Sequence, residues 1–123
     1  MWEYRALPIM TLDGDTVRLL VDIGFYARHQ IDLRLLDVHA PELRDPGGLE
    51  ARDFAVGWLE TAAQSNLTWP LLIRTQTTKV TEPTEKQTFT RYIGDIYDIT
   101  GASHLNAQLR HWLSQHPEWG PGL

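Results

Sequence analysis

The first third of the chain shows the alternation of apolar and polar positions that is typical of β-strands. Apolar residues dominate 4–11 and 31–38, and in 16–22 valine and leucine recur at every second position. Alternation of this period places one set of side chains on one face of a strand. The pattern predicts three consecutive strands in a meander, with residues 24–28 as a hairpin connection or a short strand.

The apolar spacing then changes to that of a helix. From 51 to 62, apolar residues recur at i, i+3, i+4, i+7, i+8 and i+11, which form one helical face. Residues 69–77 and 88–97 predict two further strands, separated by a polar loop over 80–86. Residues 105–113 predict a second amphipathic helix.

This order of elements predicts a mainly β fold with helices (α+β). It corresponds to the OB-fold, a five-stranded Greek-key barrel with one helix between strands three and four, here followed by a C-terminal helix. The 123 residues contain no repeat, no low-complexity segment and no long linker. We therefore expect a single domain over residues 1–123.

Composition narrows the classes of function. The chain has 11 Lys and Arg against 16 Asp and Glu, a formal charge of −5. This charge argues against strong non-specific binding to nucleic acid, although a local basic cleft remains compatible with it. The lack of cysteine excludes disulfides and thiolate metal sites. The sequence shows no signal-peptide start and no apolar run of about 20 residues. We expect a cytoplasmic monomer that does not bind membranes.

Several charged residues are candidates for chemistry. Asp13 and Asp15 flank Gly14, so both carboxylates could reach one hard cation, or the three residues could form a simple hairpin turn. Arg34 and Arg91 lie inside otherwise apolar strands. Each could face solvent or hold an anion such as phosphate.

Glu42 follows Pro41, where the chain must turn. Its carboxylate could point into a cleft and activate a water molecule as a general base, or it could be a surface side chain on a loop.

Together these segments resemble the staphylococcal (micrococcal) nuclease-like family. Residues 13–17 resemble its D-G-D-T-V turn, and residues 34–42 resemble its R-L-x-x-[IV]-D-[AT]-P-E strand end. Residues 48–51 resemble its G-x-E-A helix start, and residues 105–109 resemble its L-N-x-x-L helix. Residues 91–97 resemble the fifth strand, which carries the second arginine. The five landmarks occur in the family's order.

The resemblance implies a thermonuclease-type OB-fold and an endonuclease that cleaves phosphodiester bonds of DNA or RNA. It implies that Arg34 and Arg91 grip the scissile phosphate, and that Glu42 positions or activates the attacking water. The phosphate-contacting tyrosine that usually precedes the second arginine is missing, because residues 89–91 read Phe-Thr-Arg.

The resemblance also implies a divalent metal, calcium in the best-known members. Asp15 would be a ligand, the backbone carbonyl of Ala40 another, and Asp13 would lie in the outer shell. The family's second aspartate ligand falls on His39, and Asp37 lies two residues earlier. Imidazole suits transition metals better than calcium. We therefore expect weak calcium binding, with His39 as a ligand to Mn²⁺ or another transition metal.

Two functions compete. The first is a metal-dependent nuclease of phage or bacterial origin, favoured by the joint presence of Arg34, Glu42 and Arg91. The second is a catalytically impaired nuclease-like OB module that binds nucleic acid or a protein partner, favoured by His39 and the negative charge.

Overall fold

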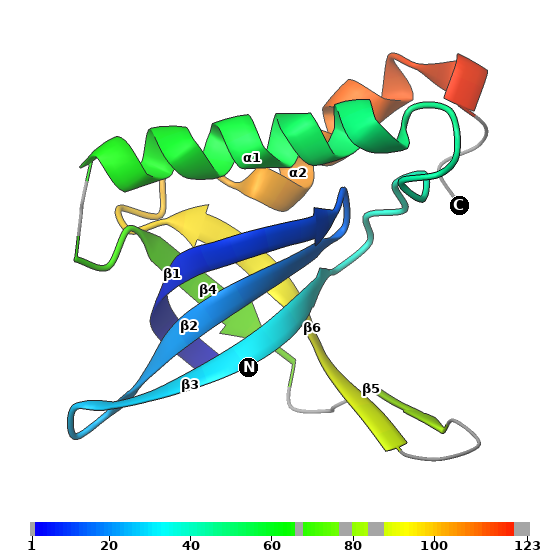
Figure 1. The fold of residues 1–123 in the computed structure, drawn as a ribbon. Coiled ribbons are helices and arrows are strands. Elements are labelled where there is room, and N and C mark those ends of the chain that lie inside the picture. Colours follow the sequence, from blue (N-terminus) through cyan, green and yellow to red (C-terminus); the bar gives the residue numbers. More distant parts are fainter. Residues whose placement is uncertain (1, 66–67, 77–79, 84–87, 120–123) are drawn as a thin grey trace.

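The computed structural model describes residues 2–65, 68–76, 80–83 and 88–119. Six strands and three helical segments make up this part of the chain (Figure 1). The strands are β1 (Trp2–Asp13), β2 (Thr16–Gly24), β3 (Ala27–Leu35), β4 (Leu71–Thr75), β5 (Val80–Pro83) and β6 (Thr88–Asp98). The helices are α1 (Gly48–Ser65), α2 (Leu105–Ser114) and the 3₁₀ segment η1 (Pro117–Trp119).

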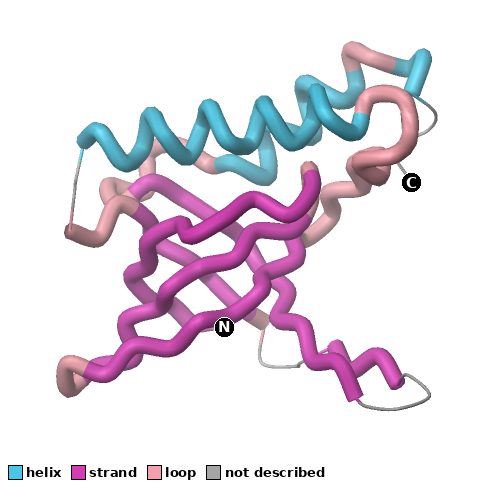
Figure 2. The backbone as a smooth tube through the Cα atoms, in the orientation of Figure 1, coloured by secondary structure: helices cyan, strands magenta, loops and turns pink. Residues whose placement is uncertain are grey.

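Five of the strands close into a barrel (Figures 1 and 2). β1, β2 and β3 form an antiparallel meander, β4 pairs with the other edge of β1, and β6 pairs with β4. Closure comes from parallel pairing of β3 with β6, which joins Leu33 to Tyr92, Arg34 to Ile93 and Leu35 to Gly94. With α1 between β3 and β4 and α2 after β6, this arrangement confirms the predicted OB-like fold.

The core of the barrel is formed by the apolar side chains that alternate with polar ones along the strands. Val17, Leu19, Leu33 and Leu35 point inward and are buried, because every second side chain of a strand faces the barrel interior. Both helices lie over the same side of the barrel (Figure 1). They add the buried residues Ala55, Leu59, Ala62, Leu105 and Leu109 to the same cluster.

The prediction of a loop over residues 80–86 was wrong for its first four residues. Residues 80–83 form β5, which pairs antiparallel with the beginning of β6. Figure 1 shows this pair as an arm that extends away from the barrel. Backbone hydrogen bonds sustain such a pair without an apolar pattern, and residues 84–86 of the predicted loop lie outside the described residues.

The third strand is displaced from its predicted position over 31–38. It begins at Ala27 and ends at Leu35, shortly before Asp37 adopts a φ of 57°. This left-handed conformation is incompatible with a continuing strand. The chain therefore leaves the barrel at Leu36 and enters the loop that leads to α1. No helix in the described part of the chain is long and apolar enough to cross a membrane.

Candidate functional site

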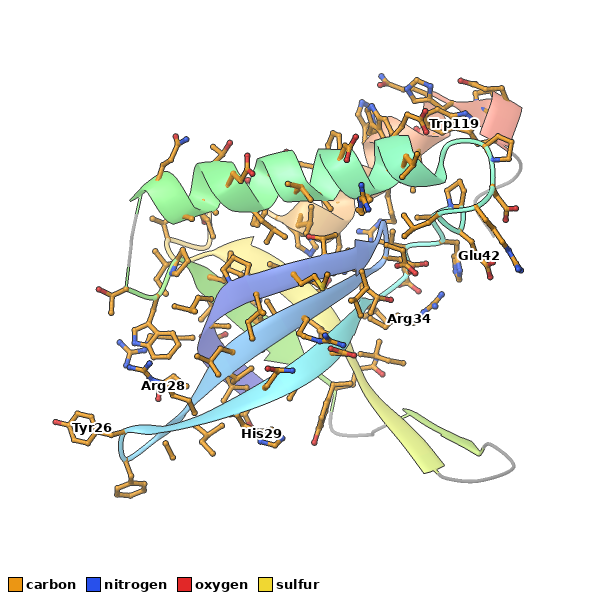
Figure 3. All side chains as sticks on the ribbon, in the orientation of Figure 1. Tyr26, Arg28, His29, Arg34, Glu42 and Trp119 are labelled. Carbon is orange, nitrogen blue, oxygen red and sulfur yellow. The ribbon has the colours of Figure 1, made fainter. Side chains whose placement is uncertain are left out.

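An open pocket of about 610 Å³ lies where the β1–β2 turn, the end of β3 and the loop before α1 meet. Its lining residues are Asp13, Asp15, Arg34, His39, Ala40, Glu42, Leu43 and Arg44. Six of these eight were singled out from the sequence. Figure 3 shows Arg34 and Glu42 at the same end of the barrel. The structure thus brings together residues from three separate segments of the chain.

The turn between β1 and β2 fixes the two aspartates. The backbone N–H of Asp15 donates a hydrogen bond of 3.1 Å to Oδ1 of Asp13. Gly14 allows the turn to lie close to its neighbours, because a Cβ at this position would lie 2.6 Å from Cβ of Ala40 and 2.8 Å from Cβ of Ala51. A side chain here would push the turn away from both the loop and α1.

The carboxylate of Asp15 is buried at the base of the pocket. Its Oδ2 accepts a hydrogen bond of 3.3 Å from the backbone N–H of Ala40, and its Oδ1 accepts one of 3.3 Å from the hydroxyl of Thr16. Oδ2 also lies 3.6 Å from Nη2 of Arg34. Burial raises the pKa of Asp15 to about 7, and the hydrogen bond and charge of Asp13 act in the same direction. Arg34 and the N–H of Ala40 lower the pKa of Asp15, but burial outweighs them.

This raised pKa makes stability depend on pH in a defined direction. The folded protein holds a proton on Asp15 up to about pH 7, whereas an unfolded chain loses it near pH 4. The free energy of unfolding therefore falls as the pH rises through this window. We expect Asp15→Asn, which mimics the protonated side chain, to be more stable than the parent by roughly 1–3 kcal/mol at pH 8 and about equal to it at pH 4.

Thermal or urea unfolding from pH 4 to pH 8, without added metal, measures this difference. Asp45→Asn is the matched control, because Asp45 is an exposed carboxylate in the loop before α1. A stability difference between Asp15→Asn and the parent that stays constant across the pH range would contradict the assignment.

Barrel closure positions Arg34 beside Asp15. Arg34 pairs with Thr16 of β2 on one side and with Ile93 of β6 on the other. The backbone carbonyl of Asp15 accepts a hydrogen bond of 2.8 Å from the N–H of Leu35, which ties the turn to the end of β3. The Arg34 side chain is 34% exposed. Because a guanidinium carries five N–H donors, Arg34 retains donors for an incoming anion while it faces Asp15.

Glu42 lies on the loop between β3 and α1, at the open side of the pocket. Its side chain is 64% exposed, and its Oε2 forms an ion pair of 3.0 Å with Nε of Arg44. The backbone passes so close to Gly48 that a Cβ there would overlap the carbonyl oxygen of Glu42. Glycine at position 48 thus allows the loop that carries Glu42 to fold back over the start of α1.

Leu43 and Arg44 also line the pocket, although no motif in the sequence pointed to them. Arg44 follows Glu42 by two residues, and this spacing of opposite charges on a short loop was the available signal. Trp119 of η1 supports the same loop from outside, because its ring packs against Gly47 and stacks on His116 at 4.3 Å (Figure 3).

Asn106 fastens the start of this loop to the barrel. It is fully buried in α2, and its Nδ2 donates hydrogen bonds of 3.1 Å to the carbonyls of Leu36 and Gly94. Its Oδ1 accepts a hydrogen bond of 3.0 Å from the N–H of Ile96. β3 has left the barrel by this level, so the amide of Asn106 takes the place of the missing strand beside β6.

The donor chemistry of the pocket fits a divalent cation. Asp13 and Asp15 share one turn, and the charge of Asp13 raises the pKa of Asp15, a repulsion that a cation would relieve. His39 lines the same pocket and is exposed. Within the described ranges, however, no three His, Asp or Glu side chains are grouped as a ready-made metal site. Asp37 is exposed and does not line the pocket.

The position of Arg91 is described only for its backbone. Arg91 lies in β6 and pairs with Val80 of β5. The next residue of β6, Tyr92, pairs with Leu33, the neighbour of Arg34 in β3. The backbones of Arg34 and Arg91 therefore lie on neighbouring strands. The predicted role of the Arg91 side chain lies outside the described residues.

No protein-family model matches the sequence, and no curated protein matches it. The functional proposal therefore rests on the chemistry of the residues around the pocket.

Proposed function

We propose that this protein is a metal-dependent nuclease of the staphylococcal nuclease-like type, which hydrolyses phosphodiester bonds of DNA or RNA. One observation carries the proposal. A buried carboxylate, Asp15, lies beside Arg34 in an open pocket that Asp13, His39 and Glu42 also line. This combination of anionic, cationic and basic groups matches the requirements of phosphodiester hydrolysis.

Each of these side chains has a distinct task in the proposed reaction. Asp15 would hold a divalent cation directly, with His39 and the backbone carbonyl of Ala40 as further ligands and Asp13 acting through water. When bound, a divalent cation polarises the phosphate and offsets its negative charge. Arg34 donates hydrogen bonds to the phosphate oxygens as negative charge develops on them.

Glu42 accepts the proton of the attacking water. In the free protein its carboxylate is paired with Arg44 at 3.0 Å on the exposed side of the pocket. A phosphate in the pocket competes for the guanidinium of Arg44 and releases Glu42 to act as a base. Arg91 is the proposed second phosphate ligand, by its place in the motif.

The second candidate is an OB module that binds nucleic acid or a protein partner without cleaving. Two observations favour it. The described part of the chain lacks a ready-made group of three metal-ligating side chains, and Glu42 is engaged by Arg44. The two functions differ in one measurable property, which is the production of shorter strands.

A cleavage assay across a panel of metals tests the proposal. The substrates are linear and circular single-stranded DNA, double-stranded DNA and RNA, each with Mn²⁺, Mg²⁺, Ca²⁺ or Zn²⁺. We expect cleavage with Mn²⁺ and weak cleavage with Ca²⁺, and cutting of the circular substrate identifies an endonuclease. In His39→Asp, which adds a hard anionic ligand, we expect calcium-dependent cleavage to rise on the order of tenfold.

Strong calcium-dependent cleavage by the parent, unchanged in His39→Asp, would show that His39 does not occupy a ligand position. Binding of the substrates without cleavage under any metal would support the second candidate. His29→Asp is the matched control for the added charge, because His29 is exposed near the opposite end of β3 (Figure 3).

A further inference from the structure

The hairpin between β2 and β3 carries two aromatic side chains that contact no part of the described chain. The connection is two residues long, since Gly24 pairs with Ala27, and it consists of Phe25 and Tyr26. Their exposed fractions are 101% and 103%, so both side chains project fully into solvent. Figure 3 shows Tyr26 at the far end of the hairpin from Arg34 and Glu42.

The backbone of this turn is strained. Phe25 has a φ of 54° and Tyr26 a φ of 63°. Positive φ at both central residues is the requirement of a tight hairpin turn that Asn-Gly or Asp-Gly normally meets, and bulky residues adopt it at a cost. Packing does not offset this conformational energy, because neither aromatic ring is buried in the folded chain. Strain that persists without a packing benefit points to a contact outside the chain.

The chemistry next to the turn indicates what that contact is. The guanidinium carbon of Arg28 lies 5.5 Å from the ring centre of Trp69, and within the described residues Arg28 forms no ion pair. Arg5 lies over the same ring at 5.8 Å, but its charge is matched by Asp22 at 2.7 Å. Asp22 lies opposite Arg28 across the strand pair and interacts with its charge, but its carboxylate is already hydrogen-bonded to Arg5. The hairpin tip, meaning Phe25, Tyr26 and Arg28, therefore combines two free aromatic faces with a cation that forms no direct ion pair in the described part of the chain.

We infer that the hairpin tip binds single-stranded nucleic acid, as a second contact remote from the pocket. Unpaired bases stack on exposed aromatic rings, and an arginine beside them contacts the phosphate of the same strand. Paired bases do not offer their faces to a protruding side chain. The inference rests on the proposed function and specifies its substrate class as single strands.

The spacing between the two contacts sets a length requirement. Tyr26 precedes Arg34 by eight residues in sequence, and both lie along the β3 side of the barrel. At about 3.3 Å per residue the two positions are roughly 26 Å apart. A strand with stacked bases advances about 3.4 Å per nucleotide, so roughly eight nucleotides bridge the pocket and the tip. Shorter strands reach one contact only.

The test replaces the aromatic pair with the residues that the turn itself prefers, Phe25→Asn together with Tyr26→Gly. Fluorescence anisotropy in EDTA measures binding of deoxyadenosine oligonucleotides, whose bases stack, to the full chain at lengths of 4 and 12 nucleotides. EDTA keeps cleavage from interfering. We expect the double variant to bind the 12-mer roughly tenfold to a hundredfold more weakly than the parent. The 4-mer, which reaches one contact, is expected to bind weakly to both proteins.

Thermal melting separates a binding role from a structural one. Relief of the turn strain is expected to raise the melting temperature of the double variant by about 5 °C. A tip that contributed to folding would instead give a lower melting temperature. Leu49→Asn is the matched control, because Leu49 is 51% exposed on α1, away from the hairpin, and its removal is expected to leave oligonucleotide binding unchanged.

Equal 12-mer binding by the double variant and the parent, or no binding by either, overturns the inference. Tip-dependent binding to vesicles of anionic phospholipid, without oligonucleotide binding, overturns it in favour of a lipid surface. Tip-dependent oligonucleotide binding without cleavage under any metal supports the inference while it refutes the nuclease. Equal cleavage rates of single-stranded substrate by the double variant and the parent would refute the inference about the hairpin tip but not the proposed nuclease activity.

Discussion

Glutamine in place of Glu42 is expected to slow phosphodiester cleavage by about 10²–10⁴-fold, the usual contribution of a general base. The substitution keeps the shape of the side chain and removes its ability to take a proton. Because the Glu42 side chain is 64% exposed and contacts Arg44 only through an ion pair, we expect the melting temperature to change little. Substrate affinity, measured in EDTA, is expected to be no lower than that of the parent, since a neutral side chain repels phosphate less than a carboxylate does and does not compete with it for Arg44.

Single-turnover cleavage with Mn²⁺ separates this chemical step from binding. Glu50→Gln serves as the control, because Glu50 is an exposed glutamate in the first turn of α1 and does not line the pocket. If Glu42→Gln cleaves as fast as Glu50→Gln, then Glu42 is not the base.

The second large effect concerns stability. Asn106→Ala is expected to lower the free energy of unfolding by about 2–4 kcal/mol. The substitution leaves the buried N–H of Ile96 without its acceptor and removes one donor from each of two carbonyls. The carbonyl of Gly94 keeps the N–H of Leu36 at 2.8 Å, so the orphaned N–H of Ile96 accounts for most of the loss.

Urea unfolding at constant pH measures this change. Gln108→Ala provides the comparison within α2, because Gln108 is exposed and, among the described residues, its side chain donates only to the hydroxyl of Ser103. It is expected to change the free energy of unfolding by less than about 0.5 kcal/mol. A loss below about 1 kcal/mol in Asn106→Ala would show that water replaces the amide at no great cost.

The sequence predicted the barrel because burial imposes a period of two on its strands, as Val17 and Leu19 show. It did not predict β5, since that strand is held by pairing with β6 rather than by burial of an apolar face. It also placed the end of β3 too late. The residues after Leu35 are apolar enough to continue a strand, but the left-handed conformation of Asp37 depends on the loop that follows.

The candidate site was predictable as far as local motifs reach. Asp13 and Asp15 share one turn, and their proximity follows from spacing alone. The meeting of Arg34 with Asp15 depends on strand register, which the motif implied only through resemblance. The three hydrogen bonds of the buried Asn106 side chain could not be predicted from the sequence, because they depend on where β3 leaves the barrel. The hairpin connection over residues 24–28 was predicted, but the strain of its turn was not, since Phe-Tyr is not a pair that signals a tight turn.

The parallel seam between β3 and β6 has a consequence for the order in which the molecule assembles. The meander of β1 to β3 forms between segments that are neighbours in sequence. The seam, in contrast, joins Leu33 to Tyr92, which are far apart in sequence. Contacts so distant in sequence carry a high entropic cost and form late in folding. Arg34 belongs to this seam. A partly folded chain can therefore hold the aspartate turn in place, but the arginine reaches its final position only when the barrel closes.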